Sequence, residues 1–259
     1  SSSGFYKSTD AGTTVTRTFN GNVKDIKFKP GDSNVIYMAT LSQFFKSTNQ
    51  GATWTQITSG LPTNQGRSVI GVSPANSSYV YLLIIDSSAA LVGVYRSNDD
   101  GVSFSKRDTG TDILESSQGW YDLALEVSPT NAETIYTGCL NVWKSTSGGS
   151  SFTKINSWSN SSQAAYTHAD IHQIRQFGNE LFVLSDGGVY RSTNAAASFT
   201  DLTSSAQIGQ FYRIAVGKQS SADIAGGLQD NGGFTRSASS WKNYYGADGM
   251  ESGIDPTDS

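Results

Sequence analysis

The 259-residue chain is poor in cysteine, proline and charge. Its single cysteine, Cys139, has no partner for an internal disulfide, and no CxxC or Cys/His array predicts a zinc site. No run of about 18 apolar residues predicts a membrane-spanning helix. Charged residues make up 15% of the chain, with a formal net charge of -4. This mild acidity argues against a nucleic-acid-binding protein, which needs clustered Lys and Arg.

Small polar residues and aromatic residues are abundant, including 27 Gly, 12 Tyr, 12 Phe and 5 Trp. Such a composition is typical either of disorder or of a β-rich extracellular domain. The regular recurrence of aromatic and β-branched residues favours the domain. The chain opens on SSSGFYKSTD, which is neither a Met start nor a signal peptide. We therefore expect it to be a piece of a longer protein.

An internal repeat predicts the fold. Five similar segments, here called the boxes, recur along the chain: YKSTDAGTTV at Tyr6, FKSTNQGATW at Phe45, YRSNDDGVSF at Tyr95, WKSTSGGSSF at Trp143 and YRSTNAAASF at Tyr190. The first serines of successive boxes are 39, 50, 48 and 47 residues apart, by subtraction of their residue numbers. This period suits one four-stranded blade of a β-propeller.

Each period divides into four short strands separated by turn residues. In one period the strands are predicted over residues 67–74, 79–85, 93–97 and 103–107, in the next over 120–129, 134–139, 141–145 and 151–155, and in the third over 170–177, 180–185, 188–192 and 198–202. Inner strands are predicted near Val23, Arg67, Trp120, Asp170, Tyr212 and Gly249. We expect an all-β protein: a single β-propeller domain over residues 1–259, with five complete blades and partial blades at both termini. The whole ring would hold roughly six to eight blades.

The boxes resemble the Asp-box, or BNR, repeat S-x-D-x-G-x-[ST]-[WF] of sialidases, xyloglucanases and sortilin-type receptors. Its third position accepts amide hydrogen bonds across a tight turn, and its glycine tolerates positive φ. The third positions are Asp10, Asn49, Asp99, Ser147 and Asn194, and the last box has Ala196 where the repeat has glycine. The boxes are therefore predicted to be structural turns, not catalytic groups.

The loops that enter inner strands and the loops between second and third strands should share one face of a propeller, because consecutive strands alternate in direction. The boxes should lie on the opposite face. The first set of loops contains Trp120, Tyr121, Asp122, His168, Asp170, His172, Asp186, Gln210, Phe211, Tyr212, Gln229, Asp230, Asn231, Asp248 and Glu251. We expect these residues to cluster at one end of the central channel. Their acidic excess predicts a cation or a hydroxyl-rich ligand.

Further segments resemble a family of large secreted bacterial proteins with BNR or sortilin-like propellers, typical of Bacteroidetes. The segments are GWYDLALEVSPTN (119–131), HADIH (168–172), SDGGVYRST (185–193), IGQFYRIAV (208–216), LQDNGG (228–233) and GADGMESGIDP (246–256). The resemblance implies a secreted or cell-surface protein that is commonly labelled glycosyl-hydrolase-like. It supplies no assigned catalytic residues.

Several chemistries remain open for the predicted face. Period-two alternation puts His168, Asp170 and His172 on one side of a strand, where they are candidate metal ligands or hydrogen-bonded structural groups. Asp186, Asp230 and Asp248 each adjoin glycine, as in an Asx turn, but converging carboxylates are also able to bind Ca²⁺ or another divalent cation. The aromatic residues are candidates for stacking on sugar rings and equally for packing between blades.

Two functions follow from these residues. One is a recognition module for a glycan or protein ligand, with the remaining propeller blades or further domains of the same protein as further candidate partners. The alternative is a glycoside hydrolase with paired carboxylates, for which Asp122, Asp230 and Asp248 are candidates. A sialidase is disfavoured because its several inner-strand arginines are represented only by Arg67, Arg175 and Arg213.

Overall fold

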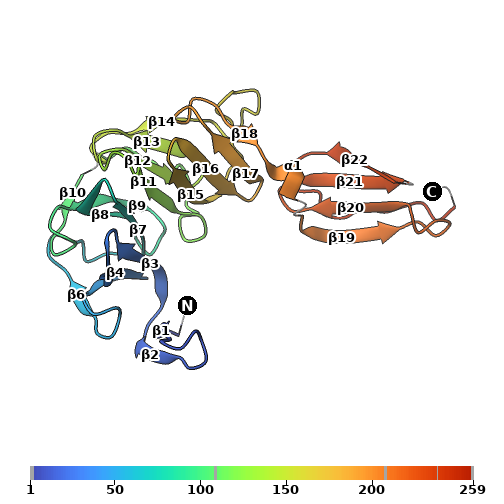
Figure 1. The fold of residues 1–259 in the computed structure, drawn as a ribbon. Coiled ribbons are helices and arrows are strands. Elements are labelled where there is room, and N and C mark those ends of the chain that lie inside the picture. The colour runs from blue at the N-terminus through green and yellow to red at the C-terminus, as the bar shows by residue number, and fades with distance from the viewer. Residues whose placement is uncertain (1–2, 108–109, 207–208, 238, 258–259) are drawn as a thin grey trace. The chain divides into compact units, whose positions relative to one another are not determined.

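The structure is a computed structural model that describes residues 3–107, 110–206, 209–237 and 239–257 (Figure 1). The chain forms two compact units, which are described separately. The first comprises Ser1–Ser185 and Val189–Thr200, and the second comprises Asp186–Gly188 and Asp201–Ser259. Ile208, the first residue of the IGQFYRIAV segment, lies outside the described residues.

The first unit consists of antiparallel sheets whose strands follow one another in chain order. A two-stranded sheet contains β1 (Phe5–Lys7) and β2 (Thr16–Phe19). The next sheet contains β3 (Val23–Lys29), β4 (Asp32–Thr40), β5 (Phe44–Ser47) and β6 (Thr55–Ile57). It is followed by β7 (Arg67–Ser73), β8 (Asn76–Ile85), β9 (Leu91–Ser97) and β10 (Ser105–Lys106). The predicted division of each period into four strands is confirmed here.

Two more four-stranded sheets lie in the first unit, apart from the strand-end residues Gly188 and Asp201. One contains β11 (Ala124–Val127), β12 (Ile135–Gly138), β13 (Val142–Ser145) and β14 (Thr153–Lys154). The other contains β15 (Ile171–Phe177), β16 (Glu180–Ser185), β17 (Gly188–Ser192) and β18 (Thr200–Asp201). The first strands β3, β7, β11 and β15 contact one another in this order, so they are the inner strands.

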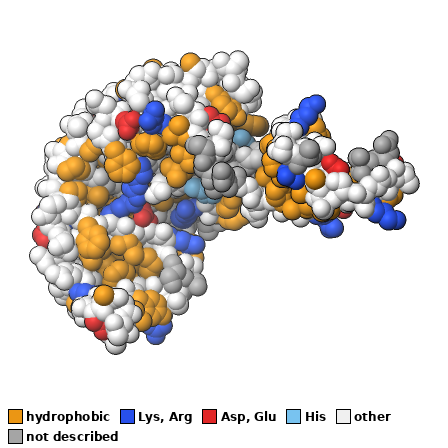
Figure 2. Space-filling view, turned by 45° about the vertical axis from the view of Figure 1, so that its right-hand side comes forward, with side chains coloured by type: hydrophobic (Ala, Val, Ile, Leu, Met, Phe, Trp, Pro, Cys, Tyr) orange, Lys and Arg blue, Asp and Glu red, His pale blue; other side chains and the backbone are white. Residues whose placement is uncertain are grey.

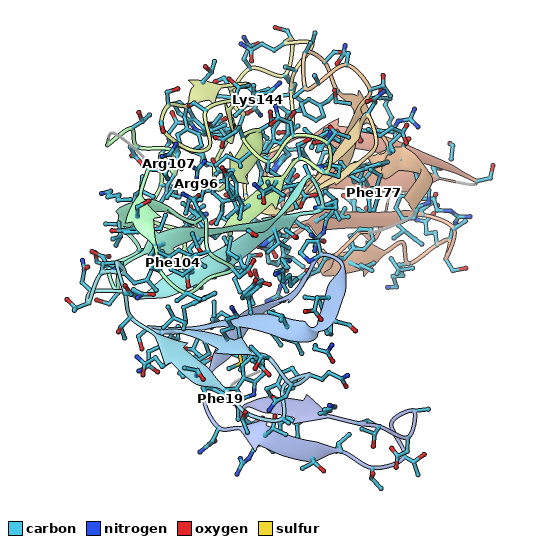
Figure 3. The ribbon with its side chains drawn as sticks, turned by 60° about the vertical axis from the view of Figure 1, so that its left-hand side comes forward. Phe19, Arg96, Phe104, Arg107, Lys144 and Phe177 are labelled. Atoms are coloured by element: carbon cyan, nitrogen blue, oxygen red, sulfur yellow. The ribbon has the colours of Figure 1, made fainter. Side chains whose placement is uncertain are left out.

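The core of this unit lies between neighbouring sheets. The second strands β4, β8 and β12 contain the longest buried runs of their sheets, and residues 80–85 of β8 form a continuous apolar run that is covered on both faces. Aromatic side chains fill the spaces between sheets: Phe19 packs on Phe45 with ring centroids 4.7 Å apart, and Phe104 packs on Phe44 at 5.1 Å (Figure 3). This packing explains the regular spacing of aromatic residues in the sequence.

The five boxes form turns with one shared set of hydrogen bonds. The first serine of each box accepts a hydrogen bond from the backbone N–H four residues later, at 2.8 to 3.0 Å. The side chain at the third position accepts from the backbone N–H four residues after it, at 2.9 to 3.2 Å. Asn49 and Asp99 both accept this hydrogen bond, and Ser147 accepts it through the hydroxyl of its shorter side chain. The sequence motif is therefore a local turn.

The boxes lie at the end of the sheets where the first strand turns into the second. Gln50 donates its backbone N–H to the carbonyl of Asn34 at 2.8 Å, and Asp100 donates to Ser78 at 3.0 Å. Within the first unit, this places the boxes opposite the loops that enter the inner strands, as the strand alternation predicts.

The second unit holds one four-stranded antiparallel sheet and a short helix, α1 (Thr203–Ala206). The sheet contains β19 (Phe211–Val216), β20 (Ile224–Leu228), β21 (Gly232–Ser237) and β22 (Ser240–Tyr245). In the part of the chain that the structure describes, no helix is long and apolar enough to cross a membrane.

Two predicted inner strands need correction. No strand forms near Gly249, because Ala247 and Met250 have positive φ and interrupt an extended backbone. The strand predicted to start at Trp120 starts at Ala124, because residues 118–122 form a turn closed by the Tyr121 N–H on the Gln118 carbonyl. The predicted single domain, ring closure and blade number stay predictions.

Candidate functional site

A cavity of about 680 Å³ opens among the loops of the first unit that lie opposite the boxes. We call it the Trp120 cavity. It is lined by Lys24, Leu41, Ser42, Gln65, Gly66, Arg67, Ile85, Asp86, Ser87, Ser88, Ala89, Ser117 and Trp120. These residues come from loops between second and third strands and from the entrances of inner strands. On the first unit, hydrophobic, basic and histidine side chains are exposed on one face (Figure 2).

Trp120 and Tyr121 project from the turn that precedes β11. Trp120 is 68% exposed, and Tyr121 is 42% exposed. Their ring centroids are 5.6 Å apart, and Tyr121 in turn meets the His172 ring edge-on at 4.7 Å. The large exposed indole surface is therefore held beside the cavity by its neighbours. An exposed aromatic group in a fixed position suits contact with a ligand.

Asp122, two residues after Trp120, is fully buried. The pKa of its carboxyl is raised to about 6, chiefly by burial and also by the nearby Asp170. A hydrogen bond with its own backbone N–H, a hydrogen bond from the Cys139 thiol and the His172 ring oppose the shift. The Cys139 Sγ lies 3.5 Å from the Asp122 Oδ1, and the Asp122 Oδ2 is buried without a hydrogen-bond partner. This candidate acid thus lies below the surface, which disfavours direct contact with a polysaccharide.

The prediction that His168, Asp170 and His172 lie on one side of a strand is wrong. The strand β15 starts only at Ile171, and Asp170 has a φ of 60°, so the period-two alternation does not extend back through it. Asp170 accepts a hydrogen bond from the Gln118 side chain at 3.1 Å. Among the described residues, these three do not form a group with ligand atoms within 4.8 Å of one another.

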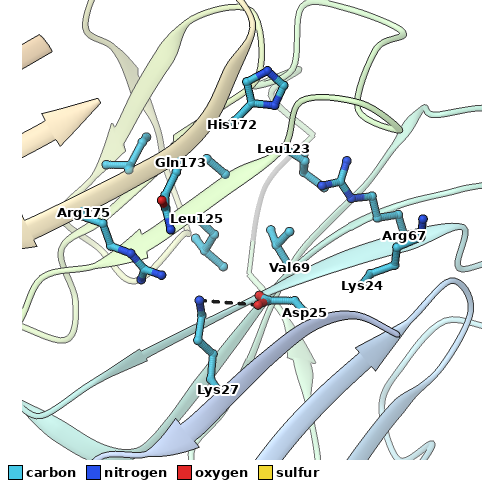
Figure 4. A pocket seen from close by; sticks show the side chains of 12 residues that line it. Lys24, Asp25, Lys27, Arg67, Val69, Leu123, Leu125, His172, Gln173 and Arg175 are labelled. Atoms are coloured by element: carbon cyan, nitrogen blue, oxygen red, sulfur yellow. Dashed lines mark ion pairs between the residues drawn. The ribbon is translucent and has the colours of Figure 1, made fainter. Parts of the chain in front are cut away.

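A second, smaller cavity of about 150 Å³ lies between the inner strands of the first unit (Figure 4). We call it the inner-strand cavity. Its charged lining residues are Lys24, Asp25, Lys27, Arg67 and Arg175, with His172 beside them. Four basic groups therefore face one acid, and the acidic excess expected near the channel is wrong for this unit. The expectation failed because it counted only loop residues and left out the lysines and arginines of the inner strands.

The remaining predicted site residues lie in the second unit. Gln229, Asp230 and Asn231 form the turn between β20 and β21, and the Asp230 N–H donates to the Asp248 Oδ1 at 2.9 Å. The Asn231 side chain donates to the backbone carbonyl of Asp186 at 3.3 Å. The structure thus brings Asp186, Asp230 and Asp248 into one region of this unit.

Glu251 lies on the surface of the second unit, 3.8 Å from the Arg213 guanidinium, and both side chains are largely exposed. The prediction that all candidate residues of both units surround one channel stays a prediction.

Sequence reasoning missed the Trp120 cavity because it followed only the later periods. The same loop types in the earlier periods supply Leu41, Ser42, Gln65 and residues 86–89. The topological rule already applied to Trp120 would have found them. No sequence pattern indicated that the basic side chains of Lys24 and Arg67 would line this cavity.

Comparisons with known proteins agree with the fold. A xyloglucanase of Hypocrea jecorina shares 31% identity over 145 residues, which cover 53% of this chain and 16% of that enzyme. The GH74 enzyme of Niastella koreensis superposes with a TM-score of 0.58 at 17% identity, covering 95% of this chain and 42% of the enzyme. PorZ, a surface component of the type-IX secretion system of Porphyromonas gingivalis, superposes with a TM-score of 0.53 at 13% identity, covering 94% of this chain and 31% of PorZ.

No protein-family model matches the chain. The solved structures are β-propellers, and the likeness shows that this chain has the same type of all-β architecture of four-stranded sheets. The chain spans less than half the length of each of these three proteins.

Proposed function

We propose that the chain is a carbohydrate-recognition module of a secreted or cell-surface protein and that the ligand binds in the Trp120 cavity. The observation that carries the proposal is the largely exposed Trp120 indole at the edge of a cavity with mixed apolar and hydrogen-bonding walls. Its volume falls in the range of about 300–1,000 Å³ that is usual for ligand pockets.

The walls match the chemistry of a sugar. The C–H face of a pyranose ring is apolar and stacks on an aromatic ring, so Trp120 offers a platform. Ser42, Ser87 and Ser117 offer hydroxyl groups that donate and accept. Sugar hydroxyls need such partners when they leave water.

The Trp120 cavity favours binding over hydrolysis. Its lining contains one carboxylate, that of Asp86, whereas glycoside hydrolysis commonly uses two. The Asp86 Oδ1 accepts hydrogen bonds from the Ser88 hydroxyl and backbone N–H and from the Ala90 N–H, at 2.7 to 3.0 Å. These bonds hold the pKa of Asp86 below its usual range, so it stays an ionised acceptor and is a poor general acid.

The test is calorimetric titration with neutral xyloglucan oligosaccharides and with acidic glycans. Trp120→Ala is expected to weaken binding at least tenfold, which corresponds to about 1.4 kcal/mol. Trp158→Ala is the matched control, because Trp158 is 45% exposed and does not line the cavity. Equal affinities for the two variants would refute the site, and an absence of binding to every glycan would refute the function.

A glycoside hydrolase is the second candidate, supported by the local identity to a xyloglucanase. Asp122, Asp230 and Asp248 remain its candidate carboxylates. Release of reducing sugar from xyloglucan by the purified protein, abolished by Asp230→Ala or Asp248→Ala, would establish this function in place of recognition alone. If the protein releases no sugar under conditions in which it binds xyloglucan, recognition alone is the function.

A further inference from the structure

Lys24 and Arg67 line both cavities of the first unit. Lys24 lies near the start of the inner strand β3, and Arg67 is the first residue of the inner strand β7. Figure 4 shows both side chains on the same side of the inner-strand cavity. Two cationic groups therefore stand where the Trp120 cavity meets the inner-strand cavity.

The carboxylates near Lys24 and Arg67 make hydrogen bonds and ion pairs with other groups. Asp25 accepts the backbone N–H groups of Ile26 and Ile70, each at 2.8 Å, and its carboxylate lies 3.5 Å from the Lys27 Nζ. In the same way, Glu126 lies 3.4 Å from the Arg175 guanidinium and accepts the Gln176 N–H at 2.9 Å.

Asp86, the one acid of the Trp120 cavity, is bonded within its own turn. Asp122 is fully buried and lines neither cavity, although its carboxyl and that of Asp25 act electrostatically on Arg67. Lys27 and Arg175 thus each have a carboxylate partner. The combined lining of the two cavities holds four basic groups and two carboxylates, so positive charge is in excess there.

The two remaining cations have free hydrogen-bonding capacity. Within the described residues, Lys24 is exposed and has no carboxylate within 4.0 Å. Arg67 donates from Nη1 to the Gly119 carbonyl at 2.9 Å, while its Nε is buried without a partner. Because Gly119 adjoins Trp120, this bond also fixes the guanidinium next to the aromatic platform.

We propose that the glycan bound here is acidic, with a carboxylate or sulfate substituent held by Lys24 and Arg67 while a sugar ring stacks on Trp120. This inference rests on the proposed carbohydrate-binding function and specifies its ligand class. A guanidinium fork and an ammonium group are the side chains best suited to an oxyanion. A neutral polysaccharide would leave the excess positive charge of the two cavities without an anionic partner.

The experiment compares matched ligands that differ only in charge. Oligogalacturonate is titrated against its methyl ester, which has no free carboxylates, and carrageenan oligosaccharides are titrated against their desulfated forms. The two pairs distinguish a carboxylate from a sulfate ligand. Binding of the preferred acidic form is expected to weaken between about 0.1 M and about 1 M salt, since the Debye length falls from about 10 to about 3 Å.

Substitutions then locate the charge. Lys24→Gln is expected to weaken binding of the acidic form roughly fivefold, as for a partly exposed charged contact, and Lys24→Arg to restore it. Lys7→Gln removes the same charge at the box end of the unit, where the Lys7 Nζ lies 3.4 Å from Gln50, and should leave affinity unchanged.

The outcomes separate the two proposals. Equal binding of charged and neutral forms, or equal effects of Lys24→Gln and Lys7→Gln, would overturn the acidic ligand. If Trp120→Ala still abolished binding in that case, the recognition function would stand. If none of the oligosaccharides bound, both proposals would fall together.

Discussion

Replacing Asp122 with asparagine should change how the stability of the chain depends on pH. The Asp122 carboxyl has no exposed surface, and its Oδ2 has no hydrogen-bond partner. Its ionised form is therefore poorly solvated, and burial is the largest cause of its raised pKa. The ionisable groups that face it are Asp170, His172, Arg67 and Cys139.

The magnitude follows from proton linkage. A pKa of about 6 in the folded state, against 3.8 in the unfolded chain, corresponds to about 3 kcal/mol. Below pH 3.8 both states hold the proton, and Asp122 adds no pH dependence. Between 3.8 and about 6 the folded state keeps a proton that the unfolded chain has lost, so stability falls as the pH rises. Above pH 6 the full loss of about 3 kcal/mol is present.

The assay is urea unfolding followed by tryptophan fluorescence, for the wild-type chain and Asp122→Asn, at about pH 4 and about pH 7.5. The free energy of unfolding of the variant, relative to wild type, should rise by about 2.4 kcal/mol between the two pH values, because at pH 4 the unfolded chain has already lost part of the proton. The cost of burying the amide is the same at both pH values and cancels. Parallel pH profiles for the two proteins would refute the reasoning.

Three further predictions concern the box turns and the aromatic platform. Gly12 and Gly51 both have positive φ, but a Cβ at Gly12 meets nothing within 4 Å, whereas one at Gly51 comes within 2.7 Å of the Phe5 ring. In denaturant unfolding, Gly12→Ala should lower the free energy of unfolding by about 1 kcal/mol. Gly51→Ala should lower it by more than that. Equal losses for the two variants would contradict the packing. Asp99→Ala should destabilise the chain by about 1 kcal/mol while Asp99→Asn, which keeps the acceptor, should not; equal thermal midpoints for the two would count against the turn role. Trp120→Ala should leave the melting temperature nearly unchanged, because the side chain is mostly exposed, and a large fall in a thermal scan would show a structural role instead.

The strands of the first unit could be predicted from the sequence because the signals are local. Each period repeats an alternation of apolar runs and turn residues, and such runs form strands wherever they occur. The box turns are also local: Ser97, Asp99 and Gly101 complete their hydrogen bonds within four residues. No distant contact is needed, so the motif alone predicts the geometry.

Strand starts next to the candidate site were harder to predict, for a physical reason. Trp120 belongs to an apolar stretch that predicts a strand. The Gln118 carbonyl, however, accepts hydrogen bonds from the N–H groups of Tyr121 and Asp122, and the resulting turn means that β11 starts only at Ala124. Asp170 adopts positive φ just before β15, which breaks the alternation assumed for its neighbours. Such turns depend on backbone conformations that residue type only weakly biases.

The sequence by itself thus determined the all-β class, the four-stranded period and the turn chemistry of the boxes. Only the tertiary structure decided that Asp122 is buried while Trp120 is exposed, although the two are separated by one residue. It also decided that Lys24 and Arg67, 43 positions apart by their residue numbers, face the same two cavities. Burial and convergence depend on which sheets pack together, and that information is spread over the whole chain instead of residing in any one segment.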